Sequence, residues 1–411
     1  MKSDRRNFLK TTLQVAAFSA IYPSMTSFIK RRESVYELNS VIDTIEIFRY
    51  DINIPRYFSW GTWLNRQHLF MKISSGNYHG WSEIPASVNN PDFNPANWVE
   101  FLKPYKGLTV NKAFEMLAKQ QENGDKYLCK QFEFTEMGLL DLAGKLQNKP
   151  AIELLNLTRK DSVPGLFCIL DKDIGKVRKN ALLSIEQNLN GYMKLKMYGD
   201  SNLDISILKT AREVLGNESI VISDANKGYK NWQSLDELTN ILIQFRENGL
   251  NAIEDPSKLS VEQWIELQNK VGTLDLIPDD PLRPAWIGLA TVKPGMGRIY
   301  NLHPSVMGSF SYVAKLALKV QSFNAQIMIG DDSLVGPACT AWQQIAIGVG
   351  AVWVEAIEKK GDSDEFIKCI TSRATFRNPK GTFSLDPKPG FGLEIDIKRL
   401  KEICPINFKI Q

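Results

Sequence analysis

Four short apolar runs follow one another in this sequence: Gly191-Tyr-Met-Lys-Leu-Lys196, Ser219-Ile-Val-Ile-Ser-Asp-Ala-Asn226, Leu250-Asn-Ala-Ile-Glu-Asp-Pro256 and Leu274-Asp-Leu-Ile-Pro-Asp-Asp280. Each run ends in charged or amide residues. Between the runs, apolar residues recur three and four positions apart, as over residues 204–216, and this spacing predicts helices with one buried face. Alternating strands and helices indicate a parallel sheet whose polar residues lie at the carboxyl ends of the strands.

The same alternation extends to both sides of this stretch. It begins at Val163 and continues through residues 298–303, 325–330 and 351–355, which gives eight candidate strands. Eight parallel strands with intervening helices are typical of a closed barrel, whose active-site face is formed by the carboxyl ends of the strands. We therefore predict a barrel over residues 161–376.

The segment before the barrel has a different pattern. Residues 42–82 alternate as an antiparallel meander does, and helical spacing follows over residues 110–121 and 132–146. We predict an α+β capping domain over residues 40–160, to which the tail, residues 377–411, returns. Two loops rich in aromatic or polar residues, 55–63 with Arg56 and Tyr57 and 85–98, either pack beneath a lid or contact a ligand.

Composition excludes several classes of protein. The 411 residues are 43% hydrophobic and 23% charged, as in a globular protein with a large core, and the formal net charge is only +4. No Lys/Arg block with interleaved aromatic residues occurs, which disfavours nucleic-acid binding. No run of 18 apolar residues occurs either, so stable membrane insertion is not expected. The five cysteines are odd in number and lack CxxC spacing, which favours structural thiols over disulfides.

The N-terminal residues 1–39 resemble a twin-arginine export signal and a linker. The segment Arg5-Arg-Asn-Phe-Leu-Lys10 precedes a modest apolar run from Leu13 to Ile21. A bacterial protein with this signal folds and takes up its cofactor in the cytoplasm and works in the periplasm. The alternative is a solvated basic tail, since Asp4 replaces the usual Ser or Thr.

Three carboxylates, Asp224, Glu254 and Asp279, end three successive predicted strands. Converging carboxylates in a partly buried barrel mouth repel one another unless a cation neutralises them. An all-oxygen ligand set in a chain with only three histidines favours Mg²⁺, with Mn²⁺ as the alternative. Any one of these residues alone would be read as a loop or helix-capping acid.

Further polar residues are predicted around this metal site. Asn226 is expected to orient a ligand or to bind substrate, and Asp255 and Asp280 to accept hydrogen bonds beside the metal ligands. Lys194 and Lys196 are two residues apart, so both side chains point into the barrel. An ammonium is disfavoured beside a dication, and Lys196 is therefore predicted to remove the α-proton of a carboxylate whose enediolate the metal stabilises.

These residues resemble the enolase superfamily, in its mandelate racemase and muconate lactonizing enzyme branch. Lys194-Leu-Lys196, Asp224-Ala-Asn226, Glu254-Asp-Pro256 and Asp279-Asp280 are similar to its K-x-K, D-x-N, E-D-P and D-E motifs. The resemblance covers nearly everything after residue 40. It implies a modified TIM barrel, (β/α)7β, with an N-terminal α+β capping domain, Lys196 as the base and Mg²⁺ on the three carboxylates.

The sequence departs from the family pattern at the sixth strand, where His303 stands in place of a second Lys. A neutral His303 is suited to proton exchange because its ordinary pKa is about 6.5. The alternative is that it only packs or hydrogen-bonds the substrate. Where dipeptide epimerases of the family carry D-x-D, this chain reads Glu355-Ala-Ile357, which does not support dipeptides. Glu355 is instead expected to donate a hydrogen bond to the substrate carboxylate in its protonated form.

Three functions follow from these residues. The first is a Mg²⁺-dependent racemase or epimerase, an isomerase that acts on a small-molecule carboxylate. The second is a lyase, such as a dehydratase of acid sugars, in which Lys196 starts the β-elimination of water. The third is an exported binding protein that keeps the metal site without catalysis. In each case we expect a homo-oligomer.

Overall fold

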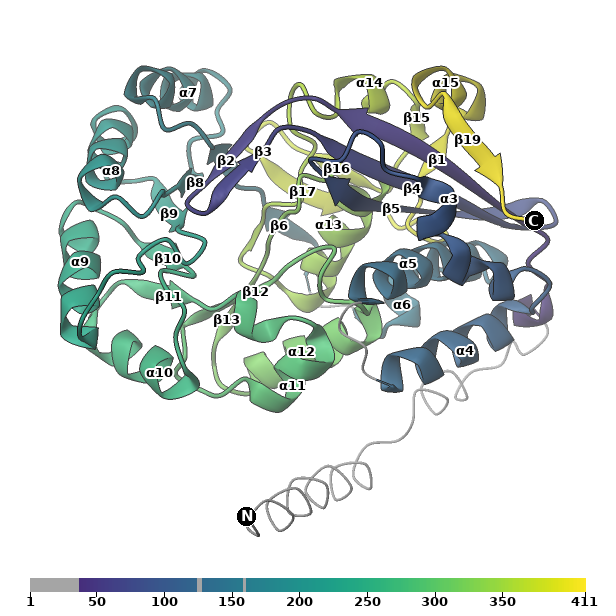
Figure 1. The fold of residues 1–411 in the computed structure, drawn as a ribbon, viewed down its shortest axis with the longest axis horizontal. Helices are drawn as coiled ribbons and strands as arrows, with labels where there is room; N and C mark the ends of the chain where they lie inside the picture. The colour runs from purple at the N-terminus through teal and green to yellow at the C-terminus, as the bar shows by residue number, and fades with distance from the viewer. Residues whose placement is uncertain (1–36, 124–127, 158–159) are drawn as a thin grey trace, which may run out of the picture.

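The computed structural model describes residues 37–123, 128–157 and 160–411 (Figure 1). The predicted export signal lies, up to residue 36, outside these ranges. Within the described ranges, no helix has both the length and the apolar character that crossing a bilayer requires.

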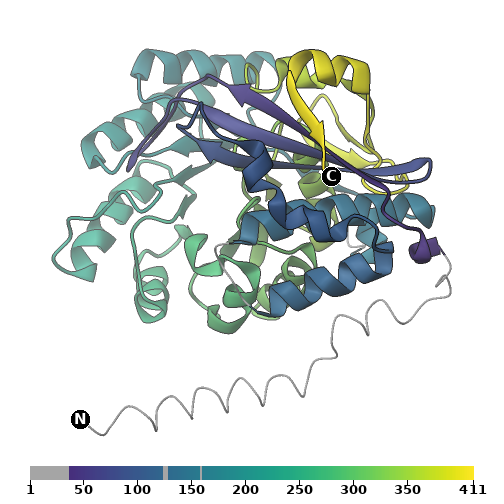
Figure 2. The same ribbon diagram turned by 45° about the vertical axis from the view of Figure 1, so that its right-hand side comes forward.

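The capping domain contains a four-stranded antiparallel sheet with the order β19-β1-β4-β5. Its strands are β1 (Thr44–Ile52), β4 (Arg66–Ser75), β5 (Tyr78–Val88) and β19 (Ile406–Lys409). The predicted meander is thus present, and the C-terminal strand β19 pairs with β1 at its edge (Figure 2). The helices beside this sheet are α4 (Val110–Glu122), α5 (Cys129–Leu146) and α6 (Ala151–Leu154), with α3 (Pro95–Trp98) and the 3₁₀ turns η1 (Glu37–Asn39) and η2 (Glu100–Tyr105).

The barrel consists of eight parallel strands in two hydrogen-bonded groups. The first group is β7 (Phe167–Ile169), β8 (Tyr192–Lys196), β9 (Ile220–Asp224), β10 (Ala252–Glu254) and β11 (Asp275–Ile277), and the second is β12 (Ile299–Leu302), β13 (Gln326–Ile329) and β14 (Trp353–Val354). The Asn301 amide donates to the Pro278 carbonyl at 3.0 Å, and the Leu166 amide donates to the Val354 carbonyl at 2.9 Å. These two bonds join the groups at both of their edges.

One helix connects each pair of successive barrel strands in the described chain. These helices are α7 (Ile174–Glu186), α8 (Ser201–Leu215), α9 (Leu235–Glu247), α10 (Val261–Lys270), α11 (Ala285–Thr291), α12 (Phe310–Gln321) and α13 (Pro337–Val349). The helix α8 shows why the sequence folds in this way, since its N-cap Asp200 accepts from two backbone amides and its buried face carries Ile207, Leu208 and Ala211. The helices form an outer layer around the strands (Figure 1).

The start of the barrel differs from our prediction. Val163 does not open the first parallel strand but lies in β6 (Ser162–Pro164), which pairs antiparallel with β17 (Thr382–Leu385). Pro164 has no amide proton to donate to a parallel neighbour, so the ladder with β8 begins only at Phe167. The remaining elements are the turn η4 (Asp280–Leu282), α14 (Asp364–Ile367), β15 (Ile370–Ser372), β16 (Thr375–Arg377), β18 (Glu394–Ile395) and α15 (Ile397–Ile403).

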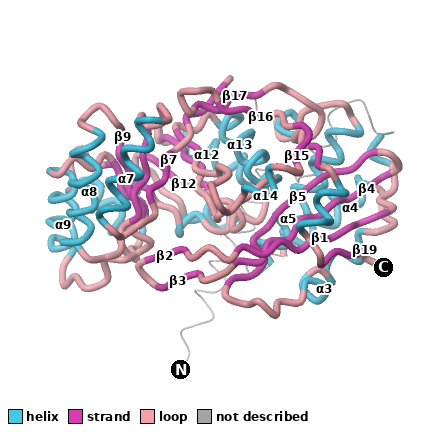
Figure 3. Tube along the Cα trace, turned by 90° about the horizontal axis from the view of Figure 1, so that it is seen from above, coloured by secondary structure: helices cyan, strands magenta, loops and turns pink. Residues whose placement is uncertain are grey.

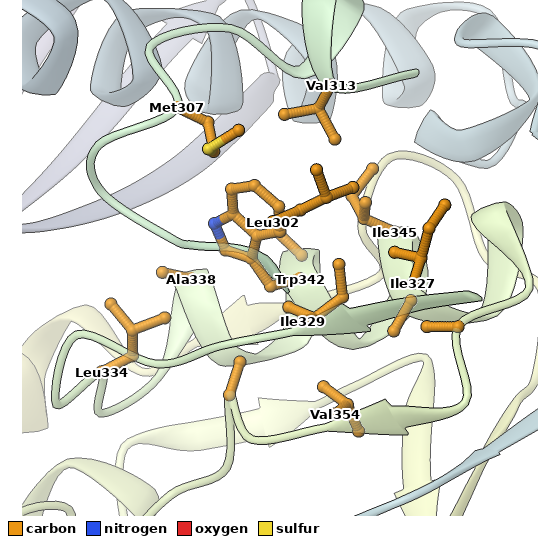
Figure 4. Close-up of a cluster of buried hydrophobic side chains, with 14 of the residues drawn as sticks. Leu302, Met307, Val313, Ile327, Ile329, Leu334, Ala338, Trp342, Ile345 and Val354 are labelled. Carbon is orange, nitrogen blue, oxygen red and sulfur yellow. The ribbon is translucent and has the colours of Figure 1, made fainter. Parts of the chain in front are cut away.

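Apolar side chains between the last barrel strands and their helices form a continuous core (Figure 4). Trp342 on α13 lies at its centre, among Leu302, Ile329 and Val313. The Trp342 indole also donates to Glu133 of α5 at 3.1 Å. The core therefore lies directly against the capping domain.

Buried carboxylates of the capping domain hold two loops at the barrel mouth. Glu133 accepts the backbone amides of Ser305, at 2.6 Å, and of Met307 and Gly308, both at 3.2 Å. Glu83 on β5 accepts the amides of Val335, Gly336 and Ala338 at the start of α13. Because the loops after β12 and β13 carry residues of the barrel mouth, the capping domain helps to position the site.

Candidate active site

A cavity of about 310 Å³ lies at the carboxyl ends of the barrel strands, beneath a hairpin of the capping domain. This hairpin, β2 (Arg56–Phe58) and β3 (Gly61–Trp63), extends from the cap sheet towards the barrel (Figure 3). Ten of the twelve residues predicted for the site line the cavity, namely Lys194, Lys196, His303, Asp224, Asp279, Asn226, Asp255, Glu355, Arg56 and Tyr57. Glu254 and Asp280 are not among the residues that line the cavity.

The three predicted metal ligands lie on adjacent strands. Asp224 and Glu254 are register partners, and Asp279 follows Ile277, the register partner of Glu254, by two residues. All three side chains are buried. Burial raises the pKa of Glu254. It acts in the same direction on Asp224, but the nearby charges of Lys196 and Lys194 outweigh it and hold the pKa of Asp224 below its usual value.

Each carboxylate faces a cationic side chain of the protein. The Lys194 ammonium donates to Glu254 at 2.7 Å and to Glu355 at 2.6 Å, and Lys196 donates to Asp224 at 2.8 Å. Asp279 forms a two-point ion pair with Arg283, whose Nε donates at 2.7 Å. Both oxygens of Glu355 accept, one from Lys194 and one from the Cys168 thiol. The hydrogen bond from a protonated Glu355 to a substrate carboxylate stays a prediction.

These ion pairs explain why no three His, Cys, Asp or Glu side chains of the described ranges converge on one point that could hold a metal ion. The donor set nevertheless fits a hard divalent cation. Its three carboxylates are buried side by side, and Oδ1 of Asn226 is buried without a hydrogen-bond partner while its Nδ2 donates to Asp224 at 3.1 Å. An unpaired oxygen beside a carboxylate is the kind of ligand that Mg²⁺ takes.

The two acids next to the predicted ligands lie in different surroundings. Asp255 accepts the backbone amides of Asp279 at 3.1 Å and Asp280 at 3.2 Å, and it thereby fixes the turn that carries the third carboxylate. Its pKa is raised to about 8, mainly by burial. The Asp280 side chain is half exposed and pairs with Lys227 at 2.7 Å.

His303 follows β12 and lines the cavity. Its Nδ1 lies 2.8 Å from the Pro304 carbonyl, and since a carbonyl only accepts, Nδ1 carries the proton and Nε2 is the acceptor. Burial, with the nearby charge of Arg283, lowers the pKa of His303 well below its usual value, so the ring is neutral. A Cβ on Gly330 would lie 2.7 Å from the Asn301 side chain and 3.1 Å from the His303 ring, which explains the glycine after β13.

The loop over residues 55–63 lines the cavity, and its contact with a ligand stays a prediction. The Phe58 ring lies over the Lys196 ammonium at 4.8 Å and stacks on Trp60 at 4.9 Å. The Ser59 hydroxyl donates to the carbonyls of Ala225 at 3.0 Å and Asn226 at 3.2 Å, directly after β9. No residue of the loop 85–98 is among those that line the cavity.

Sequence reasoning missed several residues of the cavity wall. Asp331 follows β13 and accepts from Lys359 at 2.5 Å. The rule that selected Asp224, a carboxylate after a parallel strand, could have found Asp331. No sequence motif marks Arg283, although it lies only four residues after Asp279. Phe58 belongs to the loop 55–63 that the sequence singled out, but only the folded chain brings it to Lys196.

A (β/α)7β barrel with inward lysines on its second strand and carboxylates at the carboxyl ends of its third, fourth and fifth strands defines the enolase-type class of α/β-barrel proteins. The chain belongs to the enolase C-terminal domain-like family, whose family model matches residues 176–399. The predicted superfamily and its mandelate racemase and muconate lactonizing enzyme branch are thereby confirmed.

Known proteins agree with this assignment. The N-succinyl-L-Arg/Lys racemase of Bacillus cereus is 21% identical over 274 residues, which are 65% of this chain and 70% of that protein. The muconate lactonizing enzyme of Pseudomonas fluorescens, solved with muconolactone, superposes with a TM-score of 0.73 at 18% identity and covers 89% of this chain and 99% of its own. The dipeptide epimerase of Cytophaga hutchinsonii, solved with Mg and D-Ala-L-Val, gives a TM-score of 0.73 at 13% identity, with coverage of 90% and 100%.

These structures confirm the predicted fold, a modified barrel with an N-terminal α+β cap. The matched relatives are racemases, epimerases and cycloisomerases, and the prediction of an enolase-superfamily enzyme is confirmed at the level of the family.

Proposed function

We propose that this protein is a Mg²⁺-dependent racemase or epimerase that removes the α-proton of a carboxylate substrate and returns it on the other face. One observation carries the proposal: Lys196 and His303 line the same cavity from the ends of the second and sixth of eight barrel strands. In a closed barrel of eight strands these positions lie on opposite sides. A substrate between them presents one face to each side chain.

The protonation states of the two residues suit a two-base reaction. The Lys196 ammonium donates to Asp224, whereas His303 is neutral with Nε2 as its acceptor. In this state His303 takes a proton from one face and Lys196 delivers one to the other. The reverse reaction starts with a protonated His303 and a neutral Lys196, so that Lys196 takes the proton and His303 delivers one. No further acid or base is needed.

Asp224, Glu254 and Asp279 are the residues proposed to hold Mg²⁺, with Mn²⁺ as the alternative ion. Bound there, the ion supplies positive charge that stabilises the second negative charge of a deprotonated carboxylate. Lys194 lies between Glu254 and Glu355 and donates a hydrogen bond to each. The aromatic hairpin, with Phe58 over Lys196, excludes water from the base.

The test is solvent-deuterium exchange on purified, Mg²⁺-loaded protein, followed by NMR. The substrates are acid sugars and N-acyl amino acids, because the Bacillus cereus relative is named for N-succinyl-Arg/Lys. Deuterium at the α-carbon with recovery of both stereoisomers supports the proposal. A 2-keto acid product would instead indicate the dehydratase, and binding without exchange would indicate the binding protein.

A matched pair of variants separates an enzyme from a binding protein. Lys196→Ala is expected to abolish racemisation and the exchange of the stereoisomer whose α-proton faces Lys196, whereas Lys176→Ala, at a largely exposed position on α7, is expected to leave both unchanged. Racemisation that survives in Lys196→Ala would contradict the assignment of the base.

We also propose export to the periplasm and a homo-oligomeric state. Export rests on the resemblance of Arg5-Arg6 and the apolar run after them to a twin-arginine signal. Cell fractionation of the full chain and of an Arg5→Lys, Arg6→Lys variant tests it, since the variant is expected to stay in the cytoplasm. Light scattering of the purified protein tests the oligomer.

A further inference from the structure

We propose that Glu133 of the capping domain is a positioning residue for His303 and acts through the single peptide group between Pro304 and Ser305. The inference rests on the proposed function, because it concerns the side chain that faces the substrate opposite Lys196. Glu133 lies on α5, is 1% exposed and is not among the residues that line the cavity. Any effect of Glu133 on the reaction must therefore pass through its neighbours.

The peptide group between Pro304 and Ser305 is hydrogen-bonded at both ends. Its carbonyl, that of Pro304, accepts from Nδ1 of His303 at 2.8 Å. Its amide, that of Ser305, donates to Glu133 at 2.6 Å. In a planar trans peptide the N–H and the C=O point in opposite directions, so the peptide group links the carboxylate to the imidazole. A hydrogen bond to an ionised acceptor polarises this group and strengthens the bond that its carbonyl accepts.

Four donors surround Glu133. It accepts from the amides of Ser305 at 2.6 Å and of Met307 and Gly308 at 3.2 Å, and from the indole of Trp342 at 3.1 Å. This arrangement suits an ionised carboxylate, which only accepts. Burial raises the pKa of Glu133 to about 7, and its hydrogen bonds act in the opposite direction. Measurements at pH 8 therefore find the side chain mostly ionised.

The loop that Glu133 holds has a strained backbone at Ser305. The φ of Ser305 is 69°, in the left-handed region that residues other than glycine rarely adopt. The Ser305 hydroxyl is buried without a hydrogen-bond partner, so it does not stabilise this conformation. Such backbone persists where surrounding contacts hold it. Without Glu133 we expect the loop to relax, the Pro304 carbonyl to leave Nδ1, and His303 to lose its single tautomer.

The first experiment determines the tautomer of His303 and needs no substrate. Mg²⁺-loaded protein labelled with ¹⁵N-histidine is measured at pH 8 by long-range ¹H–¹⁵N NMR, which distinguishes protonated from unprotonated ring nitrogens. The chain has three histidines, and the spectrum of His303→Asn identifies the signals of His303. We expect a protonated Nδ1 in the unmodified protein and a mixture of both tautomers in Glu133→Gln and Glu133→Met. Glu133→Gln keeps the shape of the side chain, so it provides the test if Glu133→Met does not fold.

Glu136→Gln is the matched control. Glu136 lies one turn further along α5, is fully buried, and accepts the backbone amides of Phe310 at 2.9 Å and Ser311 at 3.2 Å at the start of α12. These partners lie beyond the peptide group that His303 contacts, so this variant should keep Nδ1 protonated. An unchanged tautomer in Glu133→Gln would overturn the inference, as would an equal change in Glu136→Gln. A proton on Nε2 in the unmodified protein would also overturn it.

The second experiment measures α-proton exchange at pH 8 with a pair of stereoisomers that the unmodified protein exchanges. In Glu133→Gln, exchange of the isomer whose α-proton faces His303 should fall about tenfold, the effect of one charge-assisted hydrogen bond. The isomer that faces Lys196 should keep its rate, whereas a general loss of structure would slow both. Equal losses for the two isomers would contradict the inference. Failure of the proposed function would appear separately, as absence of exchange with any substrate, and the tautomer would still decide the inference.

Discussion

His303 donates its Nδ1 proton to the carbonyl oxygen of Pro304, the next residue in the chain, at 2.8 Å. This bond fixes the tautomer of the ring, and burial keeps the ring neutral. The consequence is a defined acceptor nitrogen at a position where the family resemblance leads one to expect a lysine. The Nε2 of the neutral ring is therefore a proton acceptor at neutral pH, as the proposed function requires of His303.

We predict that His303→Asn slows racemisation but leaves the exchange of one α-proton intact. Racemisation should fall by about 10²- to 10⁴-fold, the usual contribution of a positioned acid or base. The stereoisomer whose α-proton faces Lys196 should still exchange it with solvent. Proton NMR of each isomer in D₂O measures both rates. The control is His79→Asn, since His79 lies in the cap sheet and pairs with Glu394, and unchanged racemisation in His303→Asn would contradict the prediction.

Binding of Mg²⁺ is expected to depend on the third carboxylate of the set. Asp279→Asn removes a charged ligand and should weaken Mg²⁺ binding, which is measured as a smaller rise in thermal stability over a Mg²⁺ titration. A bound ion whose free concentration is 100 times its dissociation constant stabilises a folded protein by about 2.7 kcal/mol. Removal of Mg²⁺ by EDTA should reverse this gain in stability. Asp236→Asn, at an exposed position paired with Lys270, is the control. A titration curve identical to that of the unmodified protein would argue against Asp279 as a ligand.

The pair of Glu394 with His79 and Lys145 should make stability depend on pH. Burial acts to raise the pKa of Glu394, but His79 and Lys145 outweigh it and lower the pKa from 4.5 to about 2. Because the folded pKa is depressed, the stabilisation is complete above about pH 4.5 and is lost as the pH falls towards 2. Glu394→Gln should therefore cost about 1 kcal/mol or less at pH 6, since the side chain is partly exposed.

Urea unfolding at pH 6, 5, 4 and 3 checks this dependence. The difference between Glu394→Gln and the unmodified protein should shrink at the lower pH values, and a constant difference would contradict the linkage.

Glu83 is predicted to be important for the junction between the cap and the barrel. It is fully buried, pairs with His68 at 3.0 Å and accepts three amides at the start of α13. Glu83→Leu leaves those amides and His68 without a partner, so we expect a loss of about 3–5 kcal/mol in the free energy of unfolding. Urea denaturation measures it, with the exposed Glu115→Leu as control. A loss no larger than that of the control would show that the loop after β13 is held by other contacts.

Much of the barrel side of the site could be predicted from sequence. Lys194 and Lys196 lie on β8, and Asp224 and Glu254 end β9 and β10, where the alternation of strands and helices placed them. The error at Val163 arose because Val163 opens an apolar run, residues 163–170, and the sequence alone does not show at which residue of this run the parallel pairing begins. Asp331 was missed although it follows the same rule as Asp224, since no family motif drew attention to it.

The sequence by itself determined which side chains meet at the barrel mouth, because the period of strands and helices is local and parallel strands end on one face. Only the tertiary structure decided which charge lies beside which. Arg56 and Asp362 are 306 residues apart in the chain and 2.7 Å apart in the fold. Phe58 likewise covers Lys196 from the hairpin of the capping domain. Such contacts depend on long-range packing, and no local pattern encodes them.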